Sequence, residues 1–169
     1  MFDNRVINEL KEFLTMKQES LSVAESVTSG FIQAALSTAE NASEFFEGGI
    51  TTYNLEQKVR HLNINEEHAQ QVDCVSERVS EEMALNCAKL FKSTWALAIT
   101  GYASPVPEGG NKLFAHYAVS KNGQVVRHQC IESTTEAGLQ TQLYFANEVL
   151  RNLLELVKKE KAPLSGARN

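Results

Sequence analysis

The sequence predicts an α/β fold formed by a single domain. A short apolar segment, Trp95–Thr100, ends at Gly101 and is typical of a strand that is covered on both faces. Segments with apolar residues at helical spacing precede and follow it, as an α/β architecture requires. The chain has 169 residues, and a chain of this length buries roughly 70% of its unfolded surface around one core.

The first part of the chain alternates between helix and strand. Residues 4–17 carry apolar side chains at helical spacing after Asp3, a residue that favours a helix N-cap. Leu21–Ser26 has the length and apolar content of a strand. The helical pattern resumes at Phe31, so this part of the chain predicts helix, strand and helix in that order.

The turn after the first strand is a candidate binding site. Val27–Gly30 places hydroxyls and amides at the start of the following helix, which favours an anionic group such as phosphate or carboxylate. Ser26, Thr28, Ser29 and Gly30 are therefore candidate substrate-binding residues. The alternative, that Ser26 or Thr28 only caps the helix, is open at this point.

The middle of the chain contains one short strand and several helices. The glycine pair Gly48 and Gly49 predicts a turn that leads into a strand over Ile50–Tyr53. Helices are predicted over Leu55–Leu62, from Asn65 and from Ser76.

The last part of the chain predicts a hairpin and a long helix. Residues 100–112 hold two of the three prolines and three of the nine glycines, which indicates a long loop where a ligand can bind. Asn122-Gly123 separates two β-rich runs and predicts an antiparallel hairpin. A closing helix is predicted from about residue 136 to 159, and residues 161–169 are predicted to be a flexible tail beyond a domain of residues 1–160.

The stretch 41–58 brings together residue types that suit nucleophilic attack on a carbonyl group. Ser43 supplies a hydroxyl and Lys58 an amine, with the phenol of Tyr53 and the pair Gly48 and Gly49 between them. A serine hydroxyl needs a neighbouring base at neutral pH, and a lysine serves as that base only when its pKa is lowered. An ordinary solvated lysine is the competing interpretation.

Composition argues against several other classes of protein. A net charge of −5 without a basic stripe argues against nucleic-acid binding, and no apolar segment approaches the roughly 20 residues of a membrane span. Cys74, Cys87 and Cys130 show no CxxC spacing, so no zinc site or disulfide framework is predicted. The start of the chain lacks the pattern of a signal peptide, which predicts a cytoplasmic protein.

Five motifs, collinear over roughly residues 5 to 155, resemble the C-terminal domain of the CinA family, also called the competence/damage-inducible protein family. The motifs are Ala24-Glu25-Ser26-Val27-Thr28-Ser29-Gly30, Ala42-Ser43 to Gly49, Thr52-Tyr53-Asn54 with Lys58, Val75-Ser76-Glu77-Arg78-Val79, and Ile99-Thr100-Gly101 with Ala103 and Pro105. Five ordered motifs are far more specific than any one of them.

The resemblance implies a fold and an activity. The fold is a three-layer α/β/α sandwich with a mixed sheet. The activity is hydrolysis of the carboxamide of nicotinamide mononucleotide to the acid and ammonia, in pyridine nucleotide recycling, without a metal or other cofactor. The partner is then a small-molecule substrate, and the family also suggests a homo-oligomer.

The resemblance also implies roles for individual residues. Ser43 falls on the position of the nucleophile, Lys58 on that of the base, Tyr53 beside them, and Thr100 on a hydroxyl position at the end of the buried strand. Amides near Gly48, Gly49 or Gly101 are then expected to stabilise the oxyanion.

The chain departs from the family's pattern at several places. Val27 stands where the family has cysteine, and Ser29 where it has glycine. Tyr102–Pro105 replaces Ile-Ala-Gly-Pro, and Leu113–Ala115 replaces a Gly-Thr start of the next strand. Residues 132–136 read Glu-Ser-Thr-Thr-Glu where active members carry arginines that suit a phosphate.

Two functions therefore stay open. Retention of Ser43, Tyr53, Lys58 and Thr100 favours an amidohydrolase acting on nicotinamide mononucleotide or a related small amide. The changed loop and the lost arginines favour a non-catalytic or differently specific paralogue that binds a small ligand or a protein partner.

Overall fold

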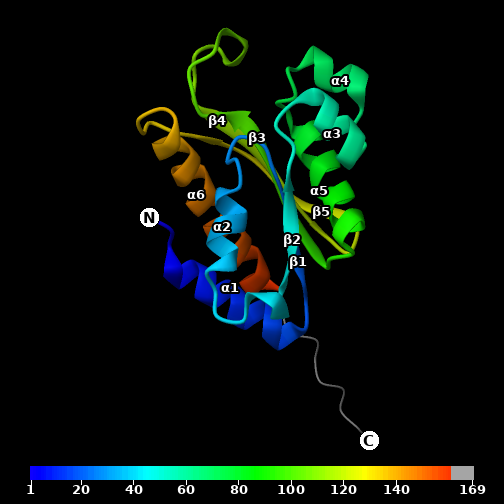
Figure 1. The fold of residues 1–169 in the computed structure, drawn as a ribbon, viewed down its shortest axis with the longest axis vertical. Coiled ribbons are helices and arrows are strands. Elements are labelled where there is room, and N and C mark those ends of the chain that lie inside the picture. The colour runs from blue at the N-terminus through cyan, green and yellow to red at the C-terminus, as the bar shows by residue number, and fades with distance from the viewer. Residues whose placement is uncertain (161–169) are drawn as a thin grey trace, which may run out of the picture.

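A computed structural model describes residues 1–160, which form three layers with one mixed sheet in the middle (Figure 1). The sheet has five strands in the order β2-β1-β3-β4-β5. The strands are β1 Leu21–Glu25, β2 Phe46–Thr51, β3 Trp95–Tyr102, β4 Phe114–Lys121 and β5 Gln124–Glu132. β1 is parallel to β2 and β3, whereas β4 is antiparallel to both β3 and β5. The predicted α/β/α fold with a mixed sheet is therefore confirmed, while the predicted tail 161–169 lies outside the described residues.

Helices cover both faces of the sheet (Figure 1). The helices are α1 Asn4–Lys17, α2 Phe31–Ser37, α3 Leu55–Leu62, α4 Glu66–Gln71, α5 Glu77–Phe91 and α6 Leu139–Lys159. Two short 3-10 turns, η1 Ala42–Glu44 and η2 Pro107–Gly109, complete the elements of residues 1–160. α1, α2 and α6 share one apolar core with the sheet, and α3, α4 and α5 share the other.

Alternating side chains of the central strands divide between these two cores. Val23 and Leu97 belong to the core under α1 and α6. Ala24 and Ala98 belong to the core under α5, so small side chains face that helix. Because successive residues of a strand point to opposite faces, the side chains at the end of β1 are also directed to different layers.

Polar side chains define the starts of several helices. The side chains of Asp3, Asn54, Asn65 and Ser76 each accept a hydrogen bond from a backbone amide in the first turn of the following helix. Such caps satisfy amides that have no partner within the helix. The predicted starts of α1, α4 and α5 are therefore confirmed.

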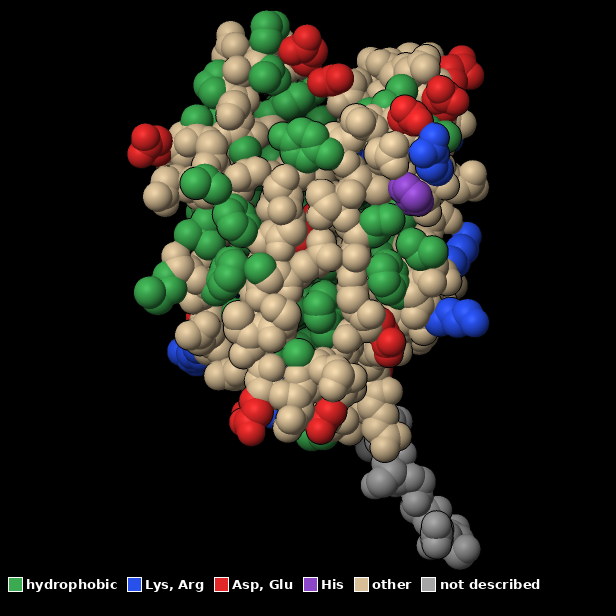
Figure 2. All heavy atoms as spheres, viewed as in Figure 1, with side chains coloured by type: hydrophobic (Ala, Val, Ile, Leu, Met, Phe, Trp, Pro, Cys, Tyr) green, Lys and Arg blue, Asp and Glu red, His purple; other side chains and the backbone are tan. Residues whose placement is uncertain are grey.

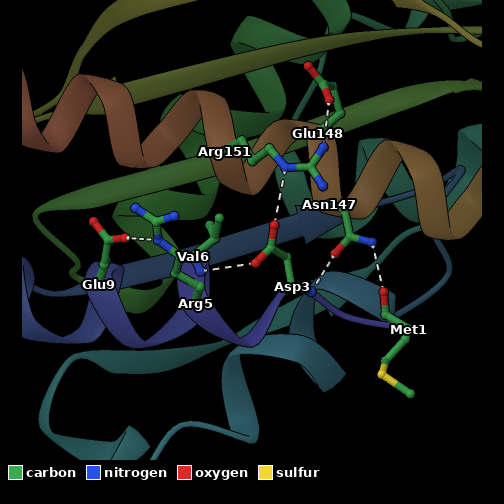
Figure 3. Close-up of polar contacts among 8 residues, drawn as sticks. All are labelled: Met1, Asp3, Arg5, Val6, Glu9, Asn147, Glu148 and Arg151. Atoms are coloured by element: carbon green, nitrogen blue, oxygen red, sulfur yellow. Dashed lines mark hydrogen bonds and ion pairs between the residues drawn. The ribbon is translucent and has the colours of Figure 1, made fainter.

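The cap at Asp3 also ties α1 to α6 (Figure 3). Arg151 Nε donates to Asp3 Oδ2 at 3.3 Å, and Asp3 N donates to Asn147 Oδ1 at 3.0 Å. The first and last helices of the described chain are thus joined on the outside of one layer. This layer supports the face of the sheet that lies opposite α5.

The β4–β5 hairpin turns at Asn122 and Gly123, as predicted. Both residues have positive φ, 49° and 78°. Two central residues with positive φ are typical of the turn that matches the twist of a two-residue hairpin. The register pairs Lys121 with Gln124 across this turn.

The predicted turn at Gly48 and Gly49 is wrong, because both glycines lie inside β2 and pair with β1. A Cβ atom on Gly49 would lie 2.5 Å from Val23 Cγ2 and 2.7 Å from Gln33 Cγ. Glycine is therefore required for close packing between β2 and its neighbours rather than for a turn.

β1 and β3 are parallel, so both end at the same edge of the sheet. Glu25, the last residue of β1, pairs with Ile99 of β3. The chain leaves β1 toward α2 on one face, and the segment after β2 leads into α3 on the other. In an open α/β sheet this edge is where ligands usually bind. Within residues 1–160, every helix is too short or too polar to cross a membrane.

Candidate active site

A pocket of about 620 Å³ lies at this edge of the sheet. Its walls come from the turn after β1, the start of α3, the segment before α5, the end of β3 with its loop, and the start of α6. The polar side chains that line it are Ser26, Tyr53, Asn54, Lys58, Asp73, Cys74, Thr100, Tyr102, Ser104 and Gln142.

The centre of the pocket is a contact between Lys58 and Ser26. Lys58 Nζ lies 2.8 Å from Ser26 Oγ and 2.7 Å from the carbonyl oxygen of Thr52. Lys58 is 1% exposed and Ser26 is 7% exposed. The amine and the hydroxyl are therefore held together away from bulk water, at the inner end of a pocket that can admit a small molecule.

The local fold explains this contact. Asn54 caps α3, and Lys58 lies in the first turns of that helix. Thr52 N donates to the carbonyl oxygen of Glu25 at 2.9 Å, which continues the pairing of the two strands beyond β2. The start of α3 is therefore placed beside the end of β1, and the Lys58 side chain reaches the residue that follows the strand.

Burial changes the protonation of this amine. Desolvation lowers the pKa of Lys58 to about 8, although nearby Cys74 and Asp73 favour its charged form. A lysine with a pKa near 8 has a substantial neutral fraction under mildly alkaline conditions, whereas an exposed lysine does not. Lys58 can therefore exchange a proton with the Ser26 hydroxyl.

One wall of the pocket is a pair of residues with unusual backbone conformation. Asp73 and Cys74 both have positive φ, 48° and 61°. Thr100 Oγ1 donates to the carbonyl oxygen of Cys74 at 2.8 Å, and Tyr102 OH donates to Asp73 Oδ2 at 2.9 Å. Burial and the Asp73 carboxylate raise the pKa of Tyr102, which stays a neutral donor. β3 thus fixes the position of this wall through two side chains.

The backbone amides at the start of α2 donate to the side chain of Glu25. Glu25 is fully buried, and its side chain accepts hydrogen bonds from Thr28 Oγ1 at 2.5 Å, Gly30 N at 3.1 Å, Ile32 N at 3.1 Å and Gln33 N at 2.8 Å. Backbone amides at this turn do bind an anionic group, as the sequence predicts, but the group is the side chain of Glu25 and not a ligand. Thr28 and Gly30 are engaged with Glu25 and do not line the pocket.

The expectation that Ser43 lies beside Lys58 is wrong. Ser43 is exposed in η1, which precedes β2, and Phe46 at the start of β2 pairs with Leu21 at the start of β1. Ser26 follows the other end of β1, so the two serines are separated by the length of a five-residue strand, about 17 Å.

The other predicted residues divide into two groups. Tyr53, Thr100 and Gly101 line the pocket together with Lys58 and Ser26. Gly48 and Gly49, by contrast, belong to the β1–β2 ladder and lie outside the pocket, and Ser29 is exposed beyond it. The expectation that amides of the glycine pair face the substrate is wrong because the glycines lie within a strand.

Six polar residues of the pocket were absent from the sequence-based candidates: Asn54, Asp73, Cys74, Tyr102, Ser104 and Gln142. Gln142 Nε2 donates to the carbonyl oxygen of Val27 at 2.9 Å, which joins α6 to the turn after β1. Three of these carried a signal in the sequence: Asn54 belongs to a motif with Tyr53, and Tyr102 and Ser104 belong to the predicted loop after Thr100. Asp73 and Gln142 come from segments whose distance from β3 cannot be predicted from spacing.

Comparison with known proteins gives a consistent picture. The chain is similar to a competence or damage-inducible protein of Enterobacter asburiae, with 25% identity, a TM-score of 0.86, and coverage of 93% of this chain and 99% of the other. It is also similar to a competence-damaged protein (CinA) superfamily protein of Escherichia coli, with 26% identity, a TM-score of 0.85, and coverage of 90% and 89%.

A curated relative is the CinA-like protein of Prochlorococcus marinus (strain MIT 9515). It is 31% identical over 167 residues, which cover 94% of this chain but 38% of the relative. The chain thus spans well under half the length of that relative. The family model for the CinA C-terminal domain matches residues 3–157. The chain therefore belongs to the CinA C-terminal domain family.

Proposed function

We propose that this protein is an amidohydrolase in which Ser26 is the nucleophile and Lys58 is the general base. Its substrate is the carboxamide of nicotinamide mononucleotide or a related small amide. The observation that carries the proposal is the 2.8 Å contact between Lys58 Nζ and Ser26 Oγ at the inner end of a pocket. A base within hydrogen-bond reach of a hydroxyl is the geometry that nucleophilic catalysis requires.

The proposed reaction has two steps. Neutral Lys58 takes the Ser26 proton as the oxygen attacks the carboxamide carbon, and it then gives this proton to the departing nitrogen, which leaves as ammonia. Water next attacks the resulting ester, again with Lys58 as base, and releases the acid and free Ser26. Val27 follows the nucleophile directly and lines the pocket, so we assign its backbone amide to stabilisation of the oxyanion.

The other residues of the pocket have supporting roles in this proposal. Tyr53 lines the opening with a side chain that is 69% exposed, and its ring can cover a planar substrate. Thr100 donates to the Cys74 carbonyl oxygen and therefore holds the pocket wall rather than reacting. The pocket of about 620 Å³ is within the range of small-molecule sites.

The experiment is a measurement of ammonia release from nicotinamide mononucleotide by purified protein and three variants. Ser26→Ala and Lys58→Met are expected to lower kcat by at least ~10³-fold, because each removes a reacting group. Ser43→Ala is the matched control, since it removes an exposed hydroxyl at the other end of β1, and it is expected to keep full activity.

The outcome separates the alternatives. A loss of activity in Ser43→Ala with normal activity in Ser26→Ala would contradict the proposed nucleophile. Equal activity in all four proteins would indicate a contaminating deamidase. No ammonia from nicotinamide mononucleotide, nicotinamide or nicotinamide riboside with wild-type protein would reject hydrolysis and leave the ligand-binding alternative.

A further inference from the structure

We infer that the pocket selects a carboxamide whose remaining part is uncharged or cationic, with the Asp73 carboxylate as the group that attracts a cation. This inference rests on the proposed function and specifies its substrate class. It arises from the charges on the pocket wall and from the groups that hold them in place.

The charge that a ligand meets at the opening is negative. Of the residues that line the pocket within 1–160, the acidic and basic ones are Asp73 and Lys58. Lys58 is 1% exposed and donates to Ser26 Oγ and to the Thr52 carbonyl oxygen, so its amine faces the reacting group. Asp73 is exposed, and its carboxylate is therefore the charge that the rest of the substrate approaches.

The Asp73 carboxylate is held in position by its neighbours. Tyr102 OH donates to Oδ2 at 2.9 Å, and the next residue, Cys74, is fixed through the hydrogen bond from Thr100 Oγ1 to its carbonyl oxygen at 2.8 Å. Both donors come from β3, a strand whose centre is fully buried. A carboxylate that is held by a side chain of a rigid strand attracts a cation with little loss of side-chain freedom.

The surroundings of this carboxylate favour a cation as well. Tyr53 and Tyr102 also line the pocket, and aromatic ring faces attract cations. Glu108, in the turn η2, is a second carboxylate close enough to interact electrostatically with the Tyr102 phenol. Figure 2 shows acidic side chains over the loop before β4 and over α4, at the end of the molecule where the pocket lies.

A phosphate monoester meets an unfavourable site here. It carries about 1.5 to 2 negative charges at neutral pH, which the Asp73 carboxylate repels. An N-substituted pyridinium carboxamide without phosphate keeps both the reacting amide and the positive ring. Nicotinamide riboside and nicotinamide mononucleotide differ by that phosphate, so this pair isolates its effect.

The experiment compares kcat/KM for nicotinamide riboside and nicotinamide mononucleotide in wild-type protein and in Asp73→Asn. In wild type, kcat/KM for the riboside is expected to exceed that for the mononucleotide by about tenfold or more. This factor corresponds to the interaction of one close pair of charges in partly screened surroundings. Asp73→Asn is expected to reduce this preference at least about fivefold, mainly through a higher KM for the riboside. Tyr102→Phe, which frees the carboxylate, is expected to change it in the same direction by less.

Glu12→Gln is the control, because it removes an exposed carboxylate on α1 and is expected to leave the ratio unchanged. A wild-type preference for the mononucleotide, or an equal ratio in wild type and Asp73→Asn, would overturn the inference while leaving hydrolysis intact. Calorimetric binding of both compounds to Ser26→Ala reads the same preference without turnover. If Ser26→Ala binds the riboside more tightly than the mononucleotide but wild type releases no ammonia, hydrolysis is rejected and the inference stands. If neither compound binds, the inference is rejected.

Discussion

Lys58 Nζ lies 2.8 Å from Ser26 Oγ, although the two residues are 32 positions apart in the chain. The contact depends on parallel pairing of β1 and β2, which places the start of α3 beside the end of β1. A buried amine that touches a buried hydroxyl is costly to keep in a folded protein, because the charged form of the amine loses its hydration. The following predictions test what this arrangement does to activity and stability.

The first prediction concerns the pH dependence of ammonia release. Burial lowers the pKa of Lys58 to about 8, and the proposed base is its neutral form. The value of kcat/KM is therefore expected to rise about tenfold per pH unit below about pH 8 and to level off above it. A pH–rate profile of wild-type protein checks this, and a profile that is flat from pH 6 to about 9 would contradict a lysine base.

The second prediction concerns the effect of Lys58 on stability. The pKa of this lysine is about 8 in the folded protein and 10.5 as its ordinary value, so the unfolded chain binds more protons between these values. Its contribution to the free energy of unfolding therefore rises with pH. Between about pH 7 and 10, the difference in unfolding free energy between wild type and Lys58→Met is expected to shift in favour of wild type by about 2 to 3 kcal/mol.

Denaturant titrations at several pH values measure this shift. Lys11→Met, which changes a lysine on α1, is the control and is expected to show a much smaller dependence. A pH-independent difference for Lys58→Met would mean that the amine keeps its ordinary pKa in the folded protein.

The third prediction concerns the carboxylate at the start of α2. Glu25→Gln is expected to destabilise the protein by about 3 kcal/mol, because the amide NH₂ group of glutamine is placed against backbone N–H donors in a buried site. Glu12→Gln, at an exposed position, is expected to change stability by less than about 0.5 kcal/mol. Thermal and chemical unfolding compare the two variants, and equal stability would show that the Glu25 hydrogen bonds contribute little.

The fourth prediction concerns Gly101 at the pocket edge. A Cβ atom there would lie 2.3 Å from Phe114 O and 2.6 Å from Ala115 Cα, both backbone atoms of β4. Gly101→Ala is therefore expected to destabilise the protein by about 3 kcal/mol. Gly110→Ala is the control, because its Cβ meets nothing within 4 Å and only its φ of +62° opposes a side chain; its expected cost is about 1 kcal/mol.

The order of elements could be predicted from local patterns. Helical spacing and cap residues identified α1, α4 and α5, and Asn122-Gly123 identified the β4–β5 hairpin. These features depend on neighbours within a few residues, which the sequence displays directly. The error at Gly48 and Gly49 has the same origin, since glycine is a local turn signal, whereas the reason for these glycines is close packing in the sheet.

The candidate site was predicted only in part, because its contacts join distant segments. The sequence predicts a reacting role for Lys58, but it predicts Ser43 as its partner, because Ser43 is nearer along the chain than Ser26. Ser26 was identified only as a binding residue. A serine that directly follows a fully buried strand, and the charged Glu25 at the end of that strand, were the available signals.

Glu25 and Ser26 are adjacent, yet their side chains leave the sheet in opposite directions, one to the amides of α2 and the other to Lys58. The single peptide unit between these residues thus links the position of α2 on one face of the sheet to the orientation of the Ser26 hydroxyl on the other. Under the proposed mechanism, a substitution on the outer side of α2 that weakens the hydrogen bonds to Glu25 is therefore expected to lower turnover, although no residue of that helix lines the pocket.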